Sequence, residues 1–192
     1  SGVSRFRVSI THQRGTLAAA FRRIPFEFPS LDEWGLPEVI KDFTELQSGM
    51  VLVTGPTGSG KSSTLAAMLR LICRTQPVHI VTIEDPIEFI HTPHKCLINQ
   101  REVGTHTKSF AGALRAALRE DPDVILVGEV RDRETAEIAV EAAMTGHLVL
   151  STLHTNDAVG TVVLLLATRL PPCCLAYAPT AVVAPRSGTA QQ

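Results

Sequence analysis

The feature that most constrains the fold of this chain is an eight-residue run that matches the pattern G-x-x-x-x-G-K-S/T in full. Its members are Gly55, Pro56, Thr57, Gly58, Ser59, Gly60, Lys61 and Ser62. The run follows a short apolar segment at 50–54 and precedes a helix-like segment at 61–74. Glycines let the backbone close around phosphate oxygens with its N–H groups pointing inward, and the dipole of the following helix favours a bound anion. The pattern therefore predicts a strand, a phosphate-binding loop and a helix.

Two side chains at the end of this loop suit a nucleoside triphosphate with a magnesium ion. Lys61 would place positive charge on the β- and γ-phosphates, and the hydroxyl of Ser62 would bind Mg²⁺. The alternative is a glycine-rich turn that matches the pattern by chance. A lysine at this spacing between a strand and a helix disfavours that alternative, so the sequence predicts nucleoside triphosphate binding.

Apolar strand candidates alternate with helix candidates from the phosphate-binding loop to residue 153. Further strands are predicted at 79–83, 124–127 and 147–153, and further helices at 109–120 and 135–144. Hydrophobic residues make up 44% of the 192 residues, which is enough for a packed core. Continuous apolar strands separated by helices indicate an α/β fold with a parallel sheet that is covered on both faces.

Four carboxylates follow two of the predicted strands. Glu129 comes after the strand at 124–127, and Glu84, Asp85 and Glu88 follow the strand at 79–83. Hydrolysis of a triphosphate needs an acid near the metal and a group that orients water. The carboxyl ends of strands face the ligand crevice in open α/β sheets, so these acids are candidates for both tasks. The alternative is that they are solvated loop acids, which four acids after two strands disfavour.

Five histidine and cysteine residues lie near the predicted strands and loops of the core. His147 and His154 bracket the strand at 147–153, and their odd offset, 154 − 147 = 7, places at least one of them beyond the strand end. Each can donate to a phosphate or act as a structural hydrogen-bonding residue. His91, His94 and Cys96 are close enough in sequence to suggest a metal site. That loop lacks a fourth ligand, which favours a solvated polar loop.

The first 25 residues carry five arginines and no acidic residue. Alternation at 5–10 predicts a strand, and 17–24 fits either a strand or a helical turn. Because two strands alone bury little surface, we expect residues 1–25 to be the end of an N-terminal domain. The proline-rich stretch at 26–37 is then a linker, and 38–192 is the core domain.

Charge and cysteine content disfavour several classes of protein. Lys and Arg number 18 against 19 Asp and Glu, a net charge of 18 − 19 = −1, and basic residues do not alternate with aromatic ones. We therefore expect no nucleic-acid partner. The four cysteines form no C-x-x-C pair, which predicts a reduced, cytoplasmic chain without a disulfide framework. The apolar stretch at 162–167 is far shorter than the roughly 20 residues that span a bilayer.

Four segments, taken in this order and spacing, resemble the secretion and pilus motor ATPases, which power type II secretion and type IV pili. The segments are GPTGSGKSST at 55–64, TIEDPIEF at 82–89, LRAALREDPDVILVGEVRD at 114–132 and TGHLVLSTLHTND at 145–157. Many enzymes share the phosphate-binding loop, whereas the four segments together are specific to this family. A further segment, CLINQREV at 96–103, is similar to the branch that retracts pili in twitching motility.

The resemblance implies a RecA-like P-loop core preceded by the end of a PAS-like N-terminal domain. It implies a hexameric ring that hydrolyses ATP with Mg²⁺, acts on a membrane-embedded pilus platform and works in the cytoplasm at the inner membrane. Family members continue well beyond the last of the four segments, and the likeness extends to about residue 166. We therefore expect the core domain to be incomplete at its C-terminal end.

The same resemblance assigns roles around the nucleotide. Residues 55–62 would form the Walker A loop, and Ser63 would contact ATP beside it. Glu88 would activate the attacking water. Glu129 would be the Walker B glutamate that acts on Mg²⁺ through water, while Ser62 binds the ion directly.

Basic side chains receive roles from the resemblance as well. His147 and His154 would form the His box, which senses the γ-phosphate and bridges to neighbouring contacts. Arginines of the preceding domain approach the nucleotide in this family, and the matching residues are Arg5, Arg7 and Arg22. Arg115 and Arg119, four apart on the predicted helix, resemble the arginines of the subunit interface.

The expected function is thus an ATP-hydrolysing motor for pilus retraction, and three alternatives stay open. A motor for pilus extension or type II secretion shares most of the motifs. A nucleotide-dependent assembly module would bind ATP without useful turnover. A nucleic-acid motor with the same core is disfavoured by the net charge.

Overall fold

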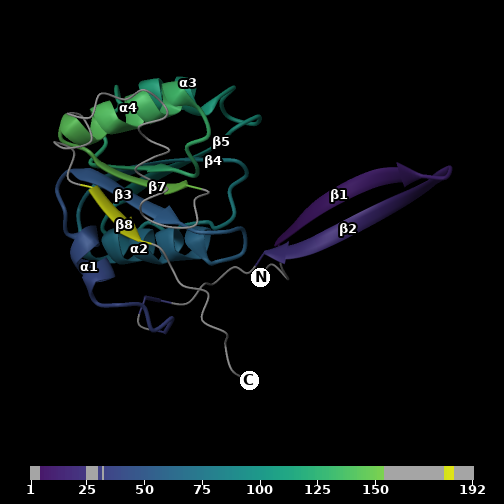
Figure 1. Ribbon diagram of the computed structural model, residues 1–192, viewed down its shortest axis with the longest axis horizontal. Coiled ribbons are helices and arrows are strands. Elements are labelled where there is room, and N and C mark those ends of the chain that lie inside the picture. Colours follow the sequence, from purple (N-terminus) through teal and green to yellow (C-terminus); the bar gives the residue numbers. More distant parts are fainter. Residues whose placement is uncertain (1–4, 25–29, 32, 154–179, 184–192) are drawn as a thin grey trace.

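A computed structural model describes residues 5–24, 30–31, 33–153 and 180–183, and the statements below concern these residues. The chain forms a six-stranded sheet flanked by helices, from which a two-stranded hairpin projects (Figure 1). The strands of the sheet lie in the order β5-β4-β6-β7-β3-β8, and all of their pairings are parallel. In chain order they are β3 (Gly49–Thr54), β4 (His79–Glu84), β5 (Leu97–Glu102), β6 (Val124–Val127), β7 (Leu148–Leu153) and β8 (Thr180–Val183).

Helices cover both faces of this sheet, as the apolar strands predicted. The helices are α1 (Val39–Thr44), α2 (Lys61–Thr75), α3 (Phe110–Ala117) and α4 (Arg133–Met144). On β3, Met50 and Leu52 pack in the cluster with α3 and α4, while Val51 and Val53 pack in the cluster with α2 on the other face. A parallel strand alternates its side chains between two buried layers in this way.

Helices α3 and α4 each begin at a capping side chain that lies next to the helix in the sequence. The Ser109 hydroxyl accepts from the N–H of Gly112 at 3.1 Å and begins α3. The Asp132 carboxylate accepts from the N–H of Thr135 at 2.8 Å and begins α4. Such side chains satisfy N–H groups that a helix leaves without internal partners. The helix predicted at 109–120 is shorter than expected, because the chain leaves it after Ala117.

Two strands of the sheet were not predicted. β5 lies at an edge, and its sequence LINQRE is too polar to give an apolar run. β8, at the other edge, pairs with β3 and comes from a tail whose pattern predicted no element. Residues 154–179 and 184–192 lie outside the described residues.

The N-terminal hairpin consists of β1 (Arg5–Gln13) and β2 (Thr16–Ile24), joined at Arg14 and Gly15. Both turn residues have positive φ angles, 49° and 79°, as a tight two-residue hairpin turn requires. The strand predicted at 5–10 is confirmed, and the segment 17–24 is a strand rather than a helical turn. Assignment of 1–25 to a PAS-like domain stays a prediction, as do the domain boundaries.

Within the described parts of the chain, none of the helices combines the length and the apolar character that crossing a bilayer requires.

Candidate active site

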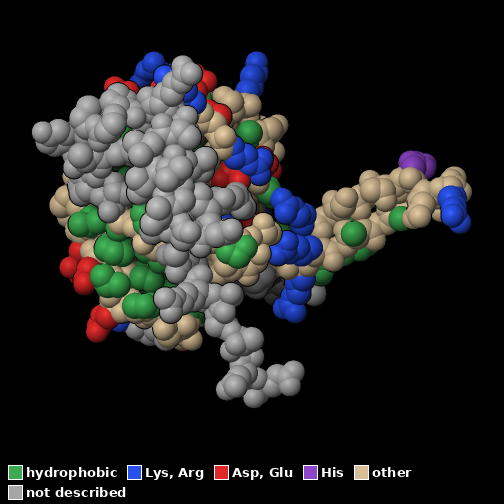
Figure 2. Space-filling model, in the orientation of Figure 1, with side chains coloured by type: hydrophobic (Ala, Val, Ile, Leu, Met, Phe, Trp, Pro, Cys, Tyr) green, Lys and Arg blue, Asp and Glu red, His purple; other side chains and the backbone are tan. Residues whose placement is uncertain are grey.

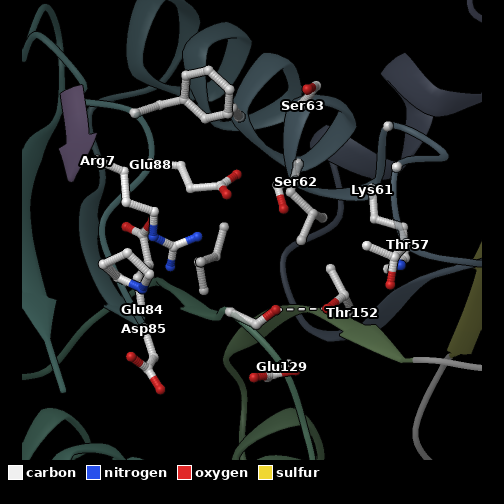
Figure 3. Close-up of a pocket in the computed structure, with 18 of the residues that line it drawn as sticks. Arg7, Thr57, Lys61, Ser62, Ser63, Glu84, Asp85, Glu88, Glu129 and Thr152 are labelled. Carbon is white, nitrogen blue, oxygen red and sulfur yellow. Dashed lines mark hydrogen bonds between the residues drawn. The ribbon is translucent and has the colours of Figure 1, made fainter. Parts of the chain in front are cut away.

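A cavity of about 440 Å³ lies at the carboxyl ends of the central strands, between the core and the base of the hairpin (Figure 3). It is lined by the phosphate-binding loop after β3, by the acidic loop after β4, and by the end of β6. Two arginines of the hairpin complete the lining. The parallel direction of the strands gathers these segments at one edge, as the crevice rule for open α/β sheets predicts.

The phosphate-binding loop has a backbone that only glycine tolerates at its key positions. Gly55, Gly58 and Gly60 have φ angles of +145°, +83° and +90°. A Cβ atom on Gly55 would lie 2.6 Å from the Oγ atom of Ser59. That Oγ atom is buried and has no hydrogen-bond partner among the described residues. A cradle with a spare buried hydroxyl fits a bound phosphate group.

Helix α2 begins directly after this loop with its N–H groups available to an anion. Its N-cap, Gly60, offers no side-chain cap, and the first turn holds no acidic residue. The positive end of the helix dipole therefore faces the cradle without a competing charge. The residues present fit the triphosphate that the sequence predicts.

Lys61 is 7% exposed and folds back onto the loop. Its Nζ atom donates to the carbonyl oxygens of Gly55 at 2.7 Å and Pro56 at 3.0 Å. Burial lowers the pKa of Lys61, and the nearby charge of Glu129 opposes that shift. Burial removes the water that would stabilise the charged ammonium, and a phosphate group beside it would stabilise that charge instead.

Glu129 follows β6 and is buried at the end of the sheet. Its carboxylate forms an ion pair with Arg131. The backbone at the preceding residue, Gly128, is held in place by Thr152, whose hydroxyl donates to the Gly128 carbonyl oxygen at 2.7 Å. It also packs tightly on β4, since a Cβ atom on Gly128 would lie 3.3 Å from the Ile83 carbonyl oxygen. Together with the Ser62 hydroxyl, this carboxylate offers the hard oxygen ligands that Mg²⁺ prefers.

Glu84, at the end of β4, and Glu88, in the loop that follows, have different surroundings. Glu84 is held by Thr82, which donates at 2.7 Å, and by Gln100, which donates at 3.2 Å. Burial raises the pKa of Glu84. Glu88 instead directs its carboxylate toward Ser62 across the cavity (Figure 3). Of the acids that the sequence offered after this strand, Glu88 is therefore the one best placed to reach a water beside a bound phosphate.

The hairpin contributes Arg7 and Arg22 to the same cavity. These residues pair directly across the two strands, so both side chains leave the same face of the hairpin. Arg5, on that face too, donates to the carbonyl oxygens of Ile87 and Glu88, at 3.4 Å in each case. Figure 2 shows Lys and Arg side chains gathered where the hairpin meets the core.

His147 does not reach this cavity. It lies just before β7, at the amino edge of the sheet, and its Nδ1 atom is 3.0 Å from the carbonyl oxygen of Ala142. Because β7 runs parallel to β3, the start of β7 lies at the amino ends of the strands and the phosphate-binding loop lies at their carboxyl ends. The arrangement gives no support to a phosphate contact by His147 within one chain. His154 lies outside the described residues.

The other predicted polar sites differ from expectation in detail. His91 is 8% exposed rather than solvated, and burial lowers its pKa to about 4. Among the described residues, no group of three or more side chains is placed to hold a metal ion. Arg115 is exposed and pairs with Glu134 at 2.7 Å. Arg119 lies two residues beyond the end of α3, and the interface role of both arginines stays a prediction.

Sequence reasoning missed several residues of the site. Thr152 and Arg131 line the cavity, and Gln100 contacts Glu84 behind it. Thr152 is the penultimate residue of a buried strand whose carboxyl end lies beside that of β6, which was a usable signal. Gln100 lies in the segment at 96–103 that carries the resemblance, but nothing in its local pattern shows what it contacts.

Comparison with known proteins agrees with this geometry. The family model described as type II/IV secretion system protein matches residues 30–186. The chain belongs to the type II/IV secretion system protein family. The match spans the strands and loops that build the cavity, so the resemblance seen in the sequence is confirmed, and the core is the RecA-like P-loop core of that family.

Relatives within this family are similar over most of the chain. A type IV pilus retraction ATPase, PilT, of Pseudomonas aeruginosa is 56% identical over 161 residues, which are 84% of this chain and 47% of the relative. A twitching motility protein of Neisseria gonorrhoeae is 60% identical over 160 residues, 83% of this chain and 43% of the relative. A crystal structure of the pilus retraction motor PilT with bound ADP matches at 55% identity and a TM-score of 0.85, covering 88% of this chain and 49% of that one. This family member thus spans about half the length of its relatives.

Proposed function

We propose that this chain is the nucleotide-binding part of an ATP-hydrolysing motor that powers type IV pilus retraction. One observation carries the proposal: a single cavity is lined by the phosphate-binding loop with Lys61, by Glu88 and Glu129 from the loops after β4 and β6, and by two arginines of the hairpin. Relatives with the names given above support the choice of reaction and of load.

The residues of the cavity divide the chemistry among them. Backbone N–H groups of the loop, Lys61 and the neighbouring hydroxyls of Thr57 and Ser63 bind the phosphates. Ser62 and, through water, Glu129 would hold Mg²⁺, which neutralises charge on the phosphate oxygens when bound. Phosphoryl transfer needs little covalent help, so catalysis here is mainly positioning and charge stabilisation.

Glu88 and the hairpin arginines act on the hydrolytic step itself. Glu88 orients the attacking water and accepts its proton. Arg7 and Arg22 stabilise the negative charge that spreads over the transferred phosphoryl group. Because the arginines belong to the hairpin, the site is complete only when the hairpin lies against the core.

The proposal extends to assembly and location. The resemblance supports a hexameric ring of this chain, in the cytoplasm at the inner membrane, that acts on a membrane-embedded pilus platform protein. Arg115 and Arg119 are exposed and available to a neighbouring subunit. Rotation about the linker at 26–37 would then couple hydrolysis to movement of the load.

The same cavity would serve two other functions. An extension or type II secretion motor would use the same cavity, and the names of the relatives above favour retraction. A binding module would hold ATP in the same phosphate cradle without turnover.

Phosphate release measured against protein concentration separates the enzyme from the binding module. We expect the rate per chain to rise with concentration, since a ring would place residues of a neighbouring chain beside each site. A flat rate near zero, with Mg·ATP still bound, would replace the motor with a binding module.

A further inference from the structure

The loop between β4 and β5, residues 85–96, has no helix or strand, yet it carries Glu88, the proposed water-activating acid. We infer that Gln100 and Glu102 of the edge strand β5 are positioning residues that bind the backbone of this loop and so aim Glu88 at the phosphate-binding loop. The inference deepens the proposed function and rests on it. It gives a physical role to the segment at 96–103, which the mechanism above leaves unused.

Gln100 binds the loop as a neighbouring strand would. Its Nε2 atom donates to the carbonyl oxygen of Phe89 at 2.8 Å, and its Oε1 atom accepts from the N–H of His91 at 3.0 Å. In a parallel pair, a residue makes the same two bonds with its own N–H and C=O, to the residues on either side of its partner. One side-chain amide thus continues the sheet into an irregular loop. The same Nε2 atom donates to Glu84 at 3.2 Å, which fixes the amide orientation.

Glu102 binds the loop one step nearer to its start. It lies two residues after Gln100 on β5, hence on the same face of the strand. Its Oε2 atom accepts from the N–H of Ile87 at 3.0 Å, and its Oε1 atom accepts from the Thr105 hydroxyl at 2.9 Å. These hydrogen bonds lower the pKa of Glu102, so the carboxylate is a stable acceptor.

The spacing of these bonds determines where Glu88 points. Backbone groups of residues 87, 89 and 91 are bound from the side of β5, and the Glu88 carboxylate is directed to the cavity, toward Ser62 (Figure 3). A shift of the bound backbone would move this carboxylate by the same amount. Misplacement by about 1 Å at a reacting centre can cost a factor of about 100 in rate.

The substitution Gln100→Glu tests the inference while keeping the shape of the side chain. It replaces the donating amide by a carboxylate that faces the Phe89 carbonyl and the Glu84 carboxylate. We expect kcat for ATP hydrolysis to fall about 10- to 100-fold with KM changed less than about threefold, because the loop moves while the phosphate cradle stays.

Asn99→Asp is the matched control, since it makes the same chemical change one residue away. The Asn99 side chain is exposed on the other face of β5 and contacts His79 at 3.1 Å. We expect its kcat to stay within about twofold of the unsubstituted chain.

Hydrogen–deuterium exchange of residues 85–91 measures the loop without turnover. Exchange should be at least about tenfold faster in Gln100→Glu than in Asn99→Asp. Equal exchange in the two variants would overturn the inference, and so would faster exchange with an unchanged kcat. Absence of phosphate release by the unsubstituted chain would overturn the proposed function instead, and the exchange result would still decide whether Gln100 holds the loop.

Discussion

The hairpin and the six-stranded core face one cavity but are held in place by different forces. Strands β3, β6 and β7 are buried along their whole length. The hairpin buries little: Phe21 is 68% exposed, and Ile10 is 68% exposed. Arg5 links the hairpin to the core through two hydrogen bonds of 3.4 Å, to the loop that carries Glu88.

This difference separates binding from turnover. Packing in the core builds the phosphate cradle, so we expect nucleotide affinity to depend on core residues. The hairpin brings positive charge from outside the core, so we expect it to matter for the rate of hydrolysis. The four predictions that follow test this division.

Glu88→Gln should give the largest effect, because it removes the group that takes the proton from water. We expect turnover to fall about 1000-fold while Mg·ATP affinity changes less than about threefold. Phosphate release and the fluorescence of Trp34 measure the two quantities. Trp34 is the one tryptophan of the sequence, and its ring lies 3.4 Å from the position of a Cβ on Gly60. Unchanged turnover would remove Glu88 from its assigned role.

Leu69→Ala in the core and Leu17→Ala in the hairpin remove the same atoms, the first from a buried position and the second from an exposed one. Leu69 is fully buried, whereas Leu17 is 69% exposed. We expect the free energy of unfolding to fall by about 3 kcal/mol for the first and by less than about 0.5 kcal/mol for the second. Urea denaturation measures both. Similar losses of unfolding free energy in the two variants would mean that Leu17 is buried in solution, which would contradict the difference between hairpin and core.

His91 should make the core side of the cavity sensitive to acid. Its pKa is lowered from 6.5 to about 4 by burial, so below pH 6.5 the unfolded chain binds a proton that the folded chain does not. This histidine therefore lowers stability as the pH falls from 6.5 toward 4, by about 3 kcal/mol in total. Urea denaturation at several pH values should show a shallower loss for His91→Gln, and an equal loss in both proteins would contradict the assignment.

Arg7→Ala and Arg22→Ala should show that the hairpin affects rate more than affinity. Each change removes a charge-assisted contact, for which we expect a fall in kcat of about 10- to 100-fold with affinity within about threefold. Arg14→Ala, at the hairpin turn, is the control, since it does not line the cavity. A loss of affinity equal to the loss of rate would place these arginines in ground-state binding.

Local patterns predicted the buried parts of the fold and the centre of the site. The run from β3 through the loop to α2 is recognisable because glycine, lysine and helix signals lie next to one another. The pairing of Arg7 with Arg22 could also have been predicted from the sequence, because a two-residue turn at 14–15 pairs residues whose numbers add up to 29.

The elements that were missed depend on distant partners. β5 lacks an apolar pattern because two of its side chains, Gln100 and Glu102, bind a loop, while Ile98 packs against the core. The position of His147 was accessible, because a parallel sheet places the start of β7 and the phosphate-binding loop at opposite ends of the strands. Edge strands and strand direction are set by tertiary contacts rather than by local propensity.

The central claim is that residues 55–62 bind the phosphates of Mg·ATP, and titration calorimetry tests it most directly. We predict one site per chain for the unsubstituted protein and an affinity about 100-fold lower for Lys61→Ala, because the buried ammonium is the main charge of the cradle. Absence of binding by the unsubstituted chain, or equal affinity in the two proteins, would contradict the account.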